Sequence, residues 1–132
     1  LRPEAVPVLT ELRRRGLRTA VVSDCTHELV VEWPRLAVAP LVDAAAFSIE
    51  VGACKPEPRI YLAAAEAIGV PPASCLYLGD GGSRELSGAR AVGMTAVLLD
   101  SDDLGDHVAH RREVGWDGPV VGGLDAILAY CD

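Results

Sequence analysis

Apolar residues along this chain alternate between helical spacing and short continuous runs. At 3–15 they fall on one face of a helix, and Gly16 follows as a stop signal. The run at 17–22 is short and mainly apolar, which predicts a buried strand. The same order of helix, glycine and apolar run recurs at Gly69 and Gly93.

The same reading extends to the rest of the chain. It predicts helices at 27–33, 57–68, 83–92 and 124–130, and strands at 45–49, 75–78, 95–99 and 119–121. Residues 100–118 are polar and irregular, which predicts a long loop with a loose helix. Repeated alternation with short connections predicts an α/β fold, a three-layer Rossmann-like parallel sheet with helices on both faces. A length of 132 residues is that of one domain, so 1–132 is expected to be a single unit.

Composition narrows the partners and the compartment. Twelve basic and nineteen acidic residues give a net charge of −7, so neither nucleic acid nor an anionic membrane is expected as a partner. No run approaches the ~20 apolar residues of a membrane helix, and the start does not look like a secretory signal. Four widely spaced cysteines without a C-x-x-C pair fit the reduced thiols of a cytoplasmic protein. Because the only methionine is Met94, we expect a processed or truncated chain.

Polar residues follow two of the predicted strands where a phosphate could bind. In open parallel sheets, ligands bind outside the carboxyl ends of the strands. Ser23 ends the first strand, and its hydroxyl could hold a phosphate or merely belong to a helix cap. Lys55 follows the second strand and is the only lysine among twelve basic residues. Its compact ammonium suits a point contact to phosphate or carboxylate oxygens.

Carboxylates follow the third predicted strand. Asp80 is followed by two glycines, and Glu85 lies five residues further on. Oxygen ligands of this kind suit Mg²⁺, which keeps several waters and takes one or two carboxylates. The alternative is that Asp80 forms the turn and that Glu85 complements the dipole of the next helix.

In order along the chain, these segments resemble the motifs of the haloacid dehalogenase superfamily, particularly its phosphatase-like branch. The segments that carry the resemblance are Val21-Val22-Ser23-Asp24, Lys55-Pro56-Glu57-Pro58-Arg59-Ile60-Tyr61, and Leu78-Gly79-Asp80 with Glu85, Gly88-Ala89 and Ala91-Val92-Gly93-Met94. The resemblance implies that Ser23 hydrogen-bonds the transferring phosphoryl group and that Lys55 neutralises its charge. It also implies that Asp80 coordinates Mg²⁺, with Glu85 as the second acidic member, directly or through water. Asp24 stands where the family often has asparagine, and Glu85 where it usually has aspartate.

The nucleophile of that family, an aspartate in a D-x-D motif, does not precede these segments. In the family it ends a strand that lies between the strands ending at Ser23 and at Asp80, and a mobile cap usually follows it. Asp100-Ser101-Asp102 imitates the motif but comes after the other segments. We therefore expect the C-terminal part of a core domain, without the first strand and the cap. Its unpaired strand edges would invite the missing N-terminal segment or a second copy of the chain.

The leading hypothesis is part of a Mg²⁺-dependent phosphohydrolase that acts on a small phosphorylated metabolite and is inactive alone. A fragment of a haloacid dehalogenase, which needs no metal, is one alternative. A non-catalytic domain that binds a ligand or a protein is another. His107 and His110 lie on a polar stretch, which favours a solvated surface over a metal site.

Overall fold

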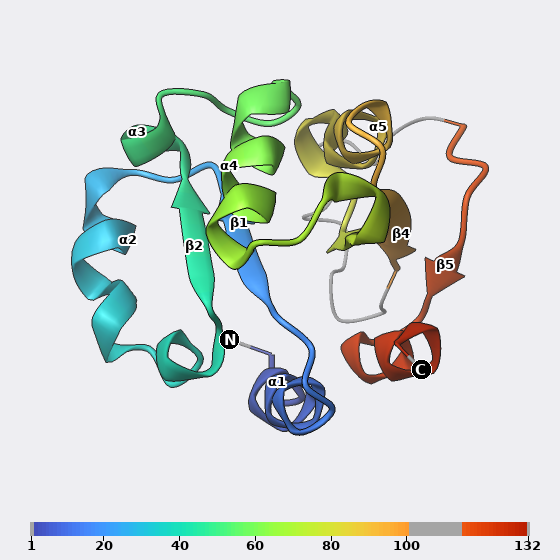
Figure 1. Ribbon diagram of the computed structural model, residues 1–132, viewed down its shortest axis with the longest axis horizontal. Helices are drawn as coiled ribbons and strands as arrows, with labels where there is room; N and C mark the ends of the chain where they lie inside the picture. Colours follow the sequence, from blue (N-terminus) through green and yellow to red (C-terminus); the bar gives the residue numbers. More distant parts are fainter. Residues whose placement is uncertain (1, 101–114, 132) are drawn as a thin grey trace.

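The computed structural model describes residues 2–100 and 115–131, so the sequence hypotheses on residues 101–102, His107 and His110 lie outside the described part (Figure 1). The α-helices are α1 (Ala5–Arg14), α2 (His27–Glu32), α3 (Ser48–Val51), α4 (Pro58–Ile68) and α5 (Glu85–Ala91). The strands are β1 (Ala20–Ser23), β2 (Ala44–Phe47), β3 (Leu76–Gly79), β4 (Thr95–Leu99) and β5 (Val120–Val121). Short 3₁₀ helices are η1 (Trp33–Arg35), η2 (Ala39–Leu41), η3 (Pro72–Ser74), η4 (Gly82–Arg84) and η7 (Leu124–Tyr130).

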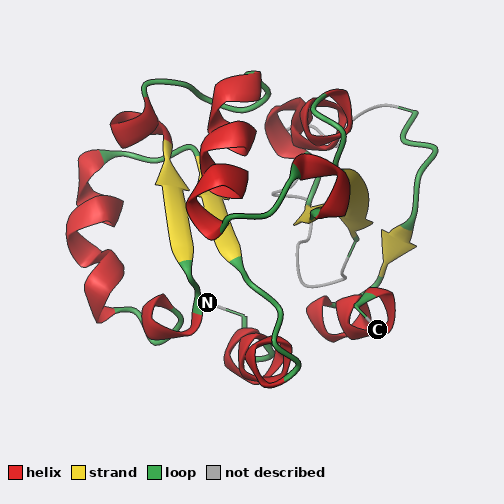
Figure 2. Cartoon of the chain, viewed as in Figure 1, coloured by secondary structure: helices red, strands yellow, loops and turns green. Residues whose placement is uncertain are grey.

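The strands form two parallel sheets. β1 pairs with β2 in one sheet, and β3, β4 and β5 lie in that order in the other. Figure 2 shows the two groups of strands with helices around them. The predicted α/β fold with parallel strands and helices on both faces is confirmed.

Successive residues of β4 face opposite helix layers. Ala96 and Leu98 belong to the core that α4 and α5 cover, whereas Val97 and Leu99 belong to the core that α1 and η7 cover. This alternation follows from the period of two along a strand. A strand buried on both sides is apolar along its length, which is why the run from Ala96 to Leu99 is recognisable in the sequence.

The helix layer on one face is continuous, whereas the sheet beneath it is interrupted. α4 packs on β1 and β2, α5 packs on β3 and β4, and the two helices contact each other. Among the described residues, β1 and β3 have one neighbouring strand each, and no strand joins them. Every residue of β1 and β3 is only partly buried, whereas Ala96 to Leu99 of β4 are buried. The interruption lies between the strands that end at Ser23 and just before Asp80, where the resemblance places the nucleophile strand.

Several boundaries differ from the sequence prediction. β1 begins later than expected, and the last two residues predicted for β2 open α3 instead. The helix expected at 83–92 begins at Glu85, because Ser83 and Arg84 have left-handed φ angles of 57° and 53°. The segment 124–130 is helical but has 3₁₀ winding.

Two further expectations concern the chain as a whole. No helix within 2–100 or 115–131 is long and apolar enough to cross a membrane. The single domain over 1–132 stays a prediction.

Candidate active site at the carboxyl ends of the strands

A buried serine ties the carboxyl ends of β1 and β2 together. Ser48 directly follows β2 and is only 9% exposed. The backbone N–H of Cys25 donates to Ser48 Oγ (2.9 Å), and the Ser48 hydroxyl donates to the carbonyl of Cys25 (3.3 Å). These two bonds fix the loop that follows Ser23.

A third bond joins the same loop to the segment that carries Lys55. The backbone N–H of Lys55 donates to Asp24 Oδ1 (2.9 Å). A carboxylate oxygen and an amide oxygen are both acceptors, so Asp24 can make the bond that an asparagine would make here. The loops after β1 and before α4 are therefore held together.

The Lys55 side chain reaches the end of β3. Its Nζ lies 3.3 Å from Glu85 Oε1, and the two side chains are 15% and 6% exposed. The same Oε1 accepts the Tyr77 hydroxyl (2.6 Å), and Oε2 accepts the N–H of Gly81 (2.9 Å). Both oxygens of Glu85 thus already accept hydrogen bonds from the protein.

Gly79 provides the space for this carboxylate. A Cβ at Gly79 would lie 2.4 Å from Glu85 Cδ and 2.5 and 2.6 Å from its two oxygens. The backbone of Glu85 is held from another side, since the hydroxyl of Tyr61 in α4 donates to its carbonyl (2.8 Å). The longer side chain of glutamate is therefore accommodated by folding back against the backbone of β3.

Asp80 lies next to this group and is half-buried. Its Oδ1 accepts the N–H of Gly82 (3.0 Å), and its carboxyl group lies close enough to that of Glu85 for each to shift the pKa of the other. Burial alone would raise the pKa of Asp80, but the bond from Gly82, the interaction with Glu85 and the charge of Lys55 bring this pKa below its usual value. Asp80 is therefore an anion at neutral pH.

The pKa values of the two neighbouring carboxyl groups are shifted in opposite directions. Burial raises the pKa of Glu85, opposed by Lys55 and Tyr77 and reinforced by Asp80. Burial, together with the charge of Glu85, also raises the pKa of Tyr77, so this phenol stays protonated and donates. Of the two carboxyl groups, Asp80 loses its proton more readily.

The predicted site residues gather at one edge. Lys55, Glu85 and Asp80 form one connected cluster, as expected for the carboxyl ends of parallel strands. Ser23 ends β1 half-buried at the same edge and is joined to the cluster through its neighbour Asp24. Within the described part of the chain, the Ser23 hydroxyl is not used in a hydrogen bond. The phosphate and metal roles of these residues stay predictions.

Sequence reasoning missed Tyr77 and Ser48 as members of the site. A hydroxyl-bearing ring inside the apolar run 75–78 was a usable signal, because a buried tyrosine usually finds a hydrogen-bond partner. Ser48 likewise interrupts the apolar run of the second predicted strand. Neither signal identifies the partner, which comes from another element.

A profile of haloacid dehalogenase-like hydrolases matches residues 1–93. The match covers more than half of the chain and includes the loops that carry Ser23, Lys55 and Glu85. The chain belongs to the haloacid dehalogenase-like hydrolase family.

Several relatives of this haloacid dehalogenase-like chain are phosphatases by name. It is 43% identical over 102 residues to phosphatase MT3486 of Mycobacterium tuberculosis, a match that covers 74% of this chain and 46% of that protein. It is 38% identical over 103 residues to a phosphoserine phosphatase of Thermus thermophilus, which covers 76% and 41% of the two chains. The chain thus spans less than half the length of these curated relatives.

Solved structures agree with the family assignment. A haloacid dehalogenase-family phosphatase from Thermococcus onnurineus superposes with a TM-score of 0.82 at 27% identity, over 98% of this chain and 57% of that one. The L-2-haloacid dehalogenase RSc1362 superposes with a TM-score of 0.77 at 28% identity, over 98% and 56% of the two chains. The family fold therefore extends over nearly the whole chain.

Among the carboxylates of the site, only Asp80 is well suited to bind magnesium. Within residues 2–100 and 115–131, no three His, Cys, Asp or Glu side chains gather to hold a metal by themselves. Mg²⁺ takes one or two carboxylates and keeps waters or substrate phosphate oxygens as its other ligands. Asp80, half-exposed and anionic, suits that need. Glu85 suits it less well, because both of its buried oxygens already accept hydrogen bonds.

Proposed function

We propose that this chain supplies the phosphate-binding and metal-side residues of a Mg²⁺-dependent phosphohydrolase that acts on a small phosphorylated metabolite. The observation that carries the proposal is the cluster of the only lysine with two carboxylates, at the edge where Ser23 ends its strand. The phosphatase relatives favour phosphate esters as the substrate class.

Each residue has a definite part in this proposal. Ser23 donates its hydroxyl to a phosphoryl oxygen, and Lys55 neutralises the negative charge that develops there. Asp80 holds Mg²⁺, and the neighbouring Glu85 supports it as the second acidic residue. Bound Mg²⁺ would stabilise the charge of the transferring phosphoryl group. Such preorganised charges lower the barrier because they need no rearrangement during the reaction.

The proposal includes a partner strand between β1 and β3. Within residues 2–100 and 115–131, both strands have an unpaired edge, and their apolar residues remain partly exposed. Their carboxyl ends meet through Lys55, which contacts Asp24 after β1 and Glu85 after β3. An inserted strand parallel to both would therefore end beside these residues, where a nucleophile is needed. We propose that it comes from sequence encoded before Leu1 or from a second copy of the chain.

A cytoplasmic location and the absence of nucleic-acid or membrane partners complete the proposal. The net charge of −7 argues against polyanionic surfaces. Cys25, Cys54 and Cys75 are free thiols, as in a reducing compartment.

Reconstitution tests the function. The chain would be assayed with p-nitrophenyl phosphate, alone and after co-expression with the segment that its gene encodes upstream, with and without Mg²⁺. We expect no turnover from the chain alone and Mg²⁺-dependent phosphate release from the complex. Equal turnover by the chain alone would contradict the missing-nucleophile part of the proposal.

A matched pair of variants tests the role of Lys55 in the complex. Lys55→Ala is expected to lower kcat by about 10²–10³, the usual effect of removing one group that stabilises transition-state charge. Arg59→Ala serves as the control, because this nearby exposed cation donates to the carbonyl of Val51 (2.9 Å). Equal loss in both variants would show a general charge effect and would count against the assignment.

The similarity to the dehalogenase RSc1362 makes dehalogenation a competing activity that should be tested. The same complex would be given 2-chloropropionate and assayed for released chloride. Chloride release without phosphate release would replace the phosphatase proposal by dehalogenation. If neither chloride nor phosphate is released, the result would favour the non-catalytic binding domain.

A further inference from the structure

Tyr77 stands out among the residues of the site, because its hydroxyl is committed to a single partner at short range. It donates to Glu85 Oε1 over 2.6 Å, whereas Lys55 Nζ approaches the same oxygen only to 3.3 Å. An O–H to carboxylate bond of 2.5–2.7 Å is among the strong charge-assisted hydrogen bonds, and an N⁺–H bond of that class is usually about 2.7–2.9 Å. The position of the Glu85 carboxylate is therefore set more by Tyr77 than by Lys55.

The Tyr77 ring is itself fixed. It packs edge-on against Tyr61 at 5.4 Å between ring centroids, and Tyr61 is fully buried. The Tyr61 hydroxyl donates to the backbone carbonyl of Glu85. A Cβ at Gly88 would lie 2.5 Å from that hydroxyl, so the glycine is what lets Tyr61 reach α5. Two tyrosines from different elements thus hold Glu85 at both ends.

From this geometry we infer that Tyr77 is a positioning residue: it fixes Glu85, and through Glu85 it fixes the ammonium group of Lys55. Without the Tyr77 hydroxyl, Oε1 would keep only the longer contact to Lys55, and the carboxylate could turn about its bond to Gly81. Lys55 would then lose the fixed acceptor that restrains its long side chain. The inference rests on the proposed function in one respect only, namely the reason why Lys55 needs to be held in place.

Because Lys55 is the only lysine, its side chain can be observed without assignment. In protein labelled with [¹³C,¹⁵N]-lysine, the ε-methylene group gives one carbon signal, and its two protons differ in chemical shift when the side chain is held. We expect two distinct proton shifts and an order parameter near that of rigid backbone, about 0.85, in the unaltered chain. In Tyr77→Phe, which keeps the ring, we expect the two shifts to merge and the order parameter to fall below about 0.6.

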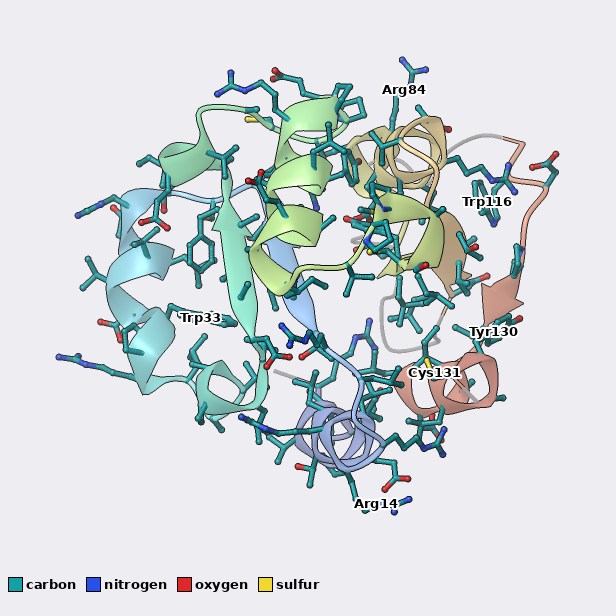
Figure 3. The ribbon with its side chains drawn as sticks, viewed as in Figure 1. Arg14, Trp33, Arg84, Trp116, Tyr130 and Cys131 are labelled. Atoms are coloured by element: carbon teal, nitrogen blue, oxygen red, sulfur yellow. The ribbon has the colours of Figure 1, made fainter. Side chains whose placement is uncertain are left out.

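Two variants separate positioning from simple loss of stability. Tyr130→Phe changes an exposed tyrosine on η7 and should leave the Lys55 signal unaltered (Figure 3). Tyr61→Phe removes a buried hydroxyl but leaves the Tyr77 bond to the carboxylate. It should lower the urea midpoint while the two ε-proton shifts of Lys55 stay distinct.

An unchanged Lys55 signal in folded Tyr77→Phe would overturn the inference, as would the same collapse in Tyr61→Phe. If Tyr77→Phe fails to fold, a measurement on the unaltered chain tests the inference instead. A Tyr77 hydroxyl proton protected from exchange, with a cross-peak to the Lys55 ε-methylene, supports the inference, and its absence overturns it. These measurements need no turnover, so a failed phosphatase assay would leave their result standing.

Discussion

Replacing Gly79 by alanine should disturb the site through one steric contact. The new Cβ would lie 2.4–2.6 Å from the carboxylate atoms of Glu85, well inside van der Waals contact. The backbone of β3 cannot easily retreat because β3 pairs with β4, so the Glu85 carboxylate must move. It would then leave its bonds from Tyr77 and Gly81.

The size of the effect follows from those bonds. A hydrogen bond to a charged group contributes about 1.5–3 kcal/mol, and Glu85 is too buried for water to replace the donors. Alanine also restricts the unfolded chain, which stabilises the fold by about 0.4–1 kcal/mol. Because two such bonds are lost, we expect Gly79→Ala to lower the free energy of unfolding by about 2–5 kcal/mol.

Urea unfolding followed by tryptophan fluorescence and circular dichroism measures this change. Gly122→Ala is the matched control, because its Cβ would meet nothing within 4 Å, and it should be neutral or slightly stabilising. In a Glu85→Ala background the clash is absent, so Gly79→Ala should cost nothing there. An equal cost in both backgrounds, or no cost in the unaltered chain, would refute the reasoning.

Three further outcomes follow from other contacts. Ser48→Ala should lower the free energy of unfolding by about 1–3 kcal/mol, because the half-buried N–H of Cys25 loses its acceptor. A change below about 0.5 kcal/mol in urea unfolding would contradict this. Asp24→Asn should leave the free energy of unfolding unchanged, whereas Asp24→Ala should lower it by about 0.5–1.5 kcal/mol, because only asparagine keeps an acceptor for the N–H of Lys55. Equal urea midpoints for the two variants would count against the bond. Hydrogen bonds from Arg14 and Arg15 lower the pKa of Glu11 to about 2, so the contribution of Glu11 to stability is present above the unfolded pKa near 4.5 and is lost as pH falls toward 2. Glu11→Gln should flatten the acid side of the stability profile in that window, and an unchanged profile would exclude the effect.

Much of the fold was predictable because local pattern and tertiary burial agree. The helical spacing of 57–68 predicted a buried face, and α4 buries Tyr61, Ala64, Ala65 and Ile68. Gly69 ends that helix with a left-handed φ of 70°, as the stop signal predicted. The run 95–99 became β4 without a change of boundary.

The start of α5 could not be predicted from local signals. Ser83 and Arg84 adopt left-handed φ angles that residues other than glycine rarely adopt. Figure 3 shows the Arg84 side chain pointing away from the molecule, so nothing in its own packing favours the turn. The turn instead accompanies the bond from the N–H of Gly81 to Glu85, which is a contact between the two ends of the same loop.

The candidate site was predictable as a place but not as a network. The carboxyl ends of parallel strands share an edge, and this brought Ser23, Lys55, Asp80 and Glu85 together in prediction and in structure. The tyrosine that holds Glu85 was not predictable, because its role depends on which side of β3 the carboxylate folds against. That choice depends on Gly79 having no side chain, and it becomes visible only in three dimensions.

The alternation along β4 determines which changes of length the chain can tolerate. Because Ala96 and Leu98 face one core and Val97 and Leu99 face the other, removing a single residue just before β4 would turn every one of these side chains to the opposite layer. A deletion of two residues would keep each side chain on its own layer. In a deletion scan of the turn before β4, single-residue losses should therefore be more damaging than double losses, the reverse of the order expected for a surface loop.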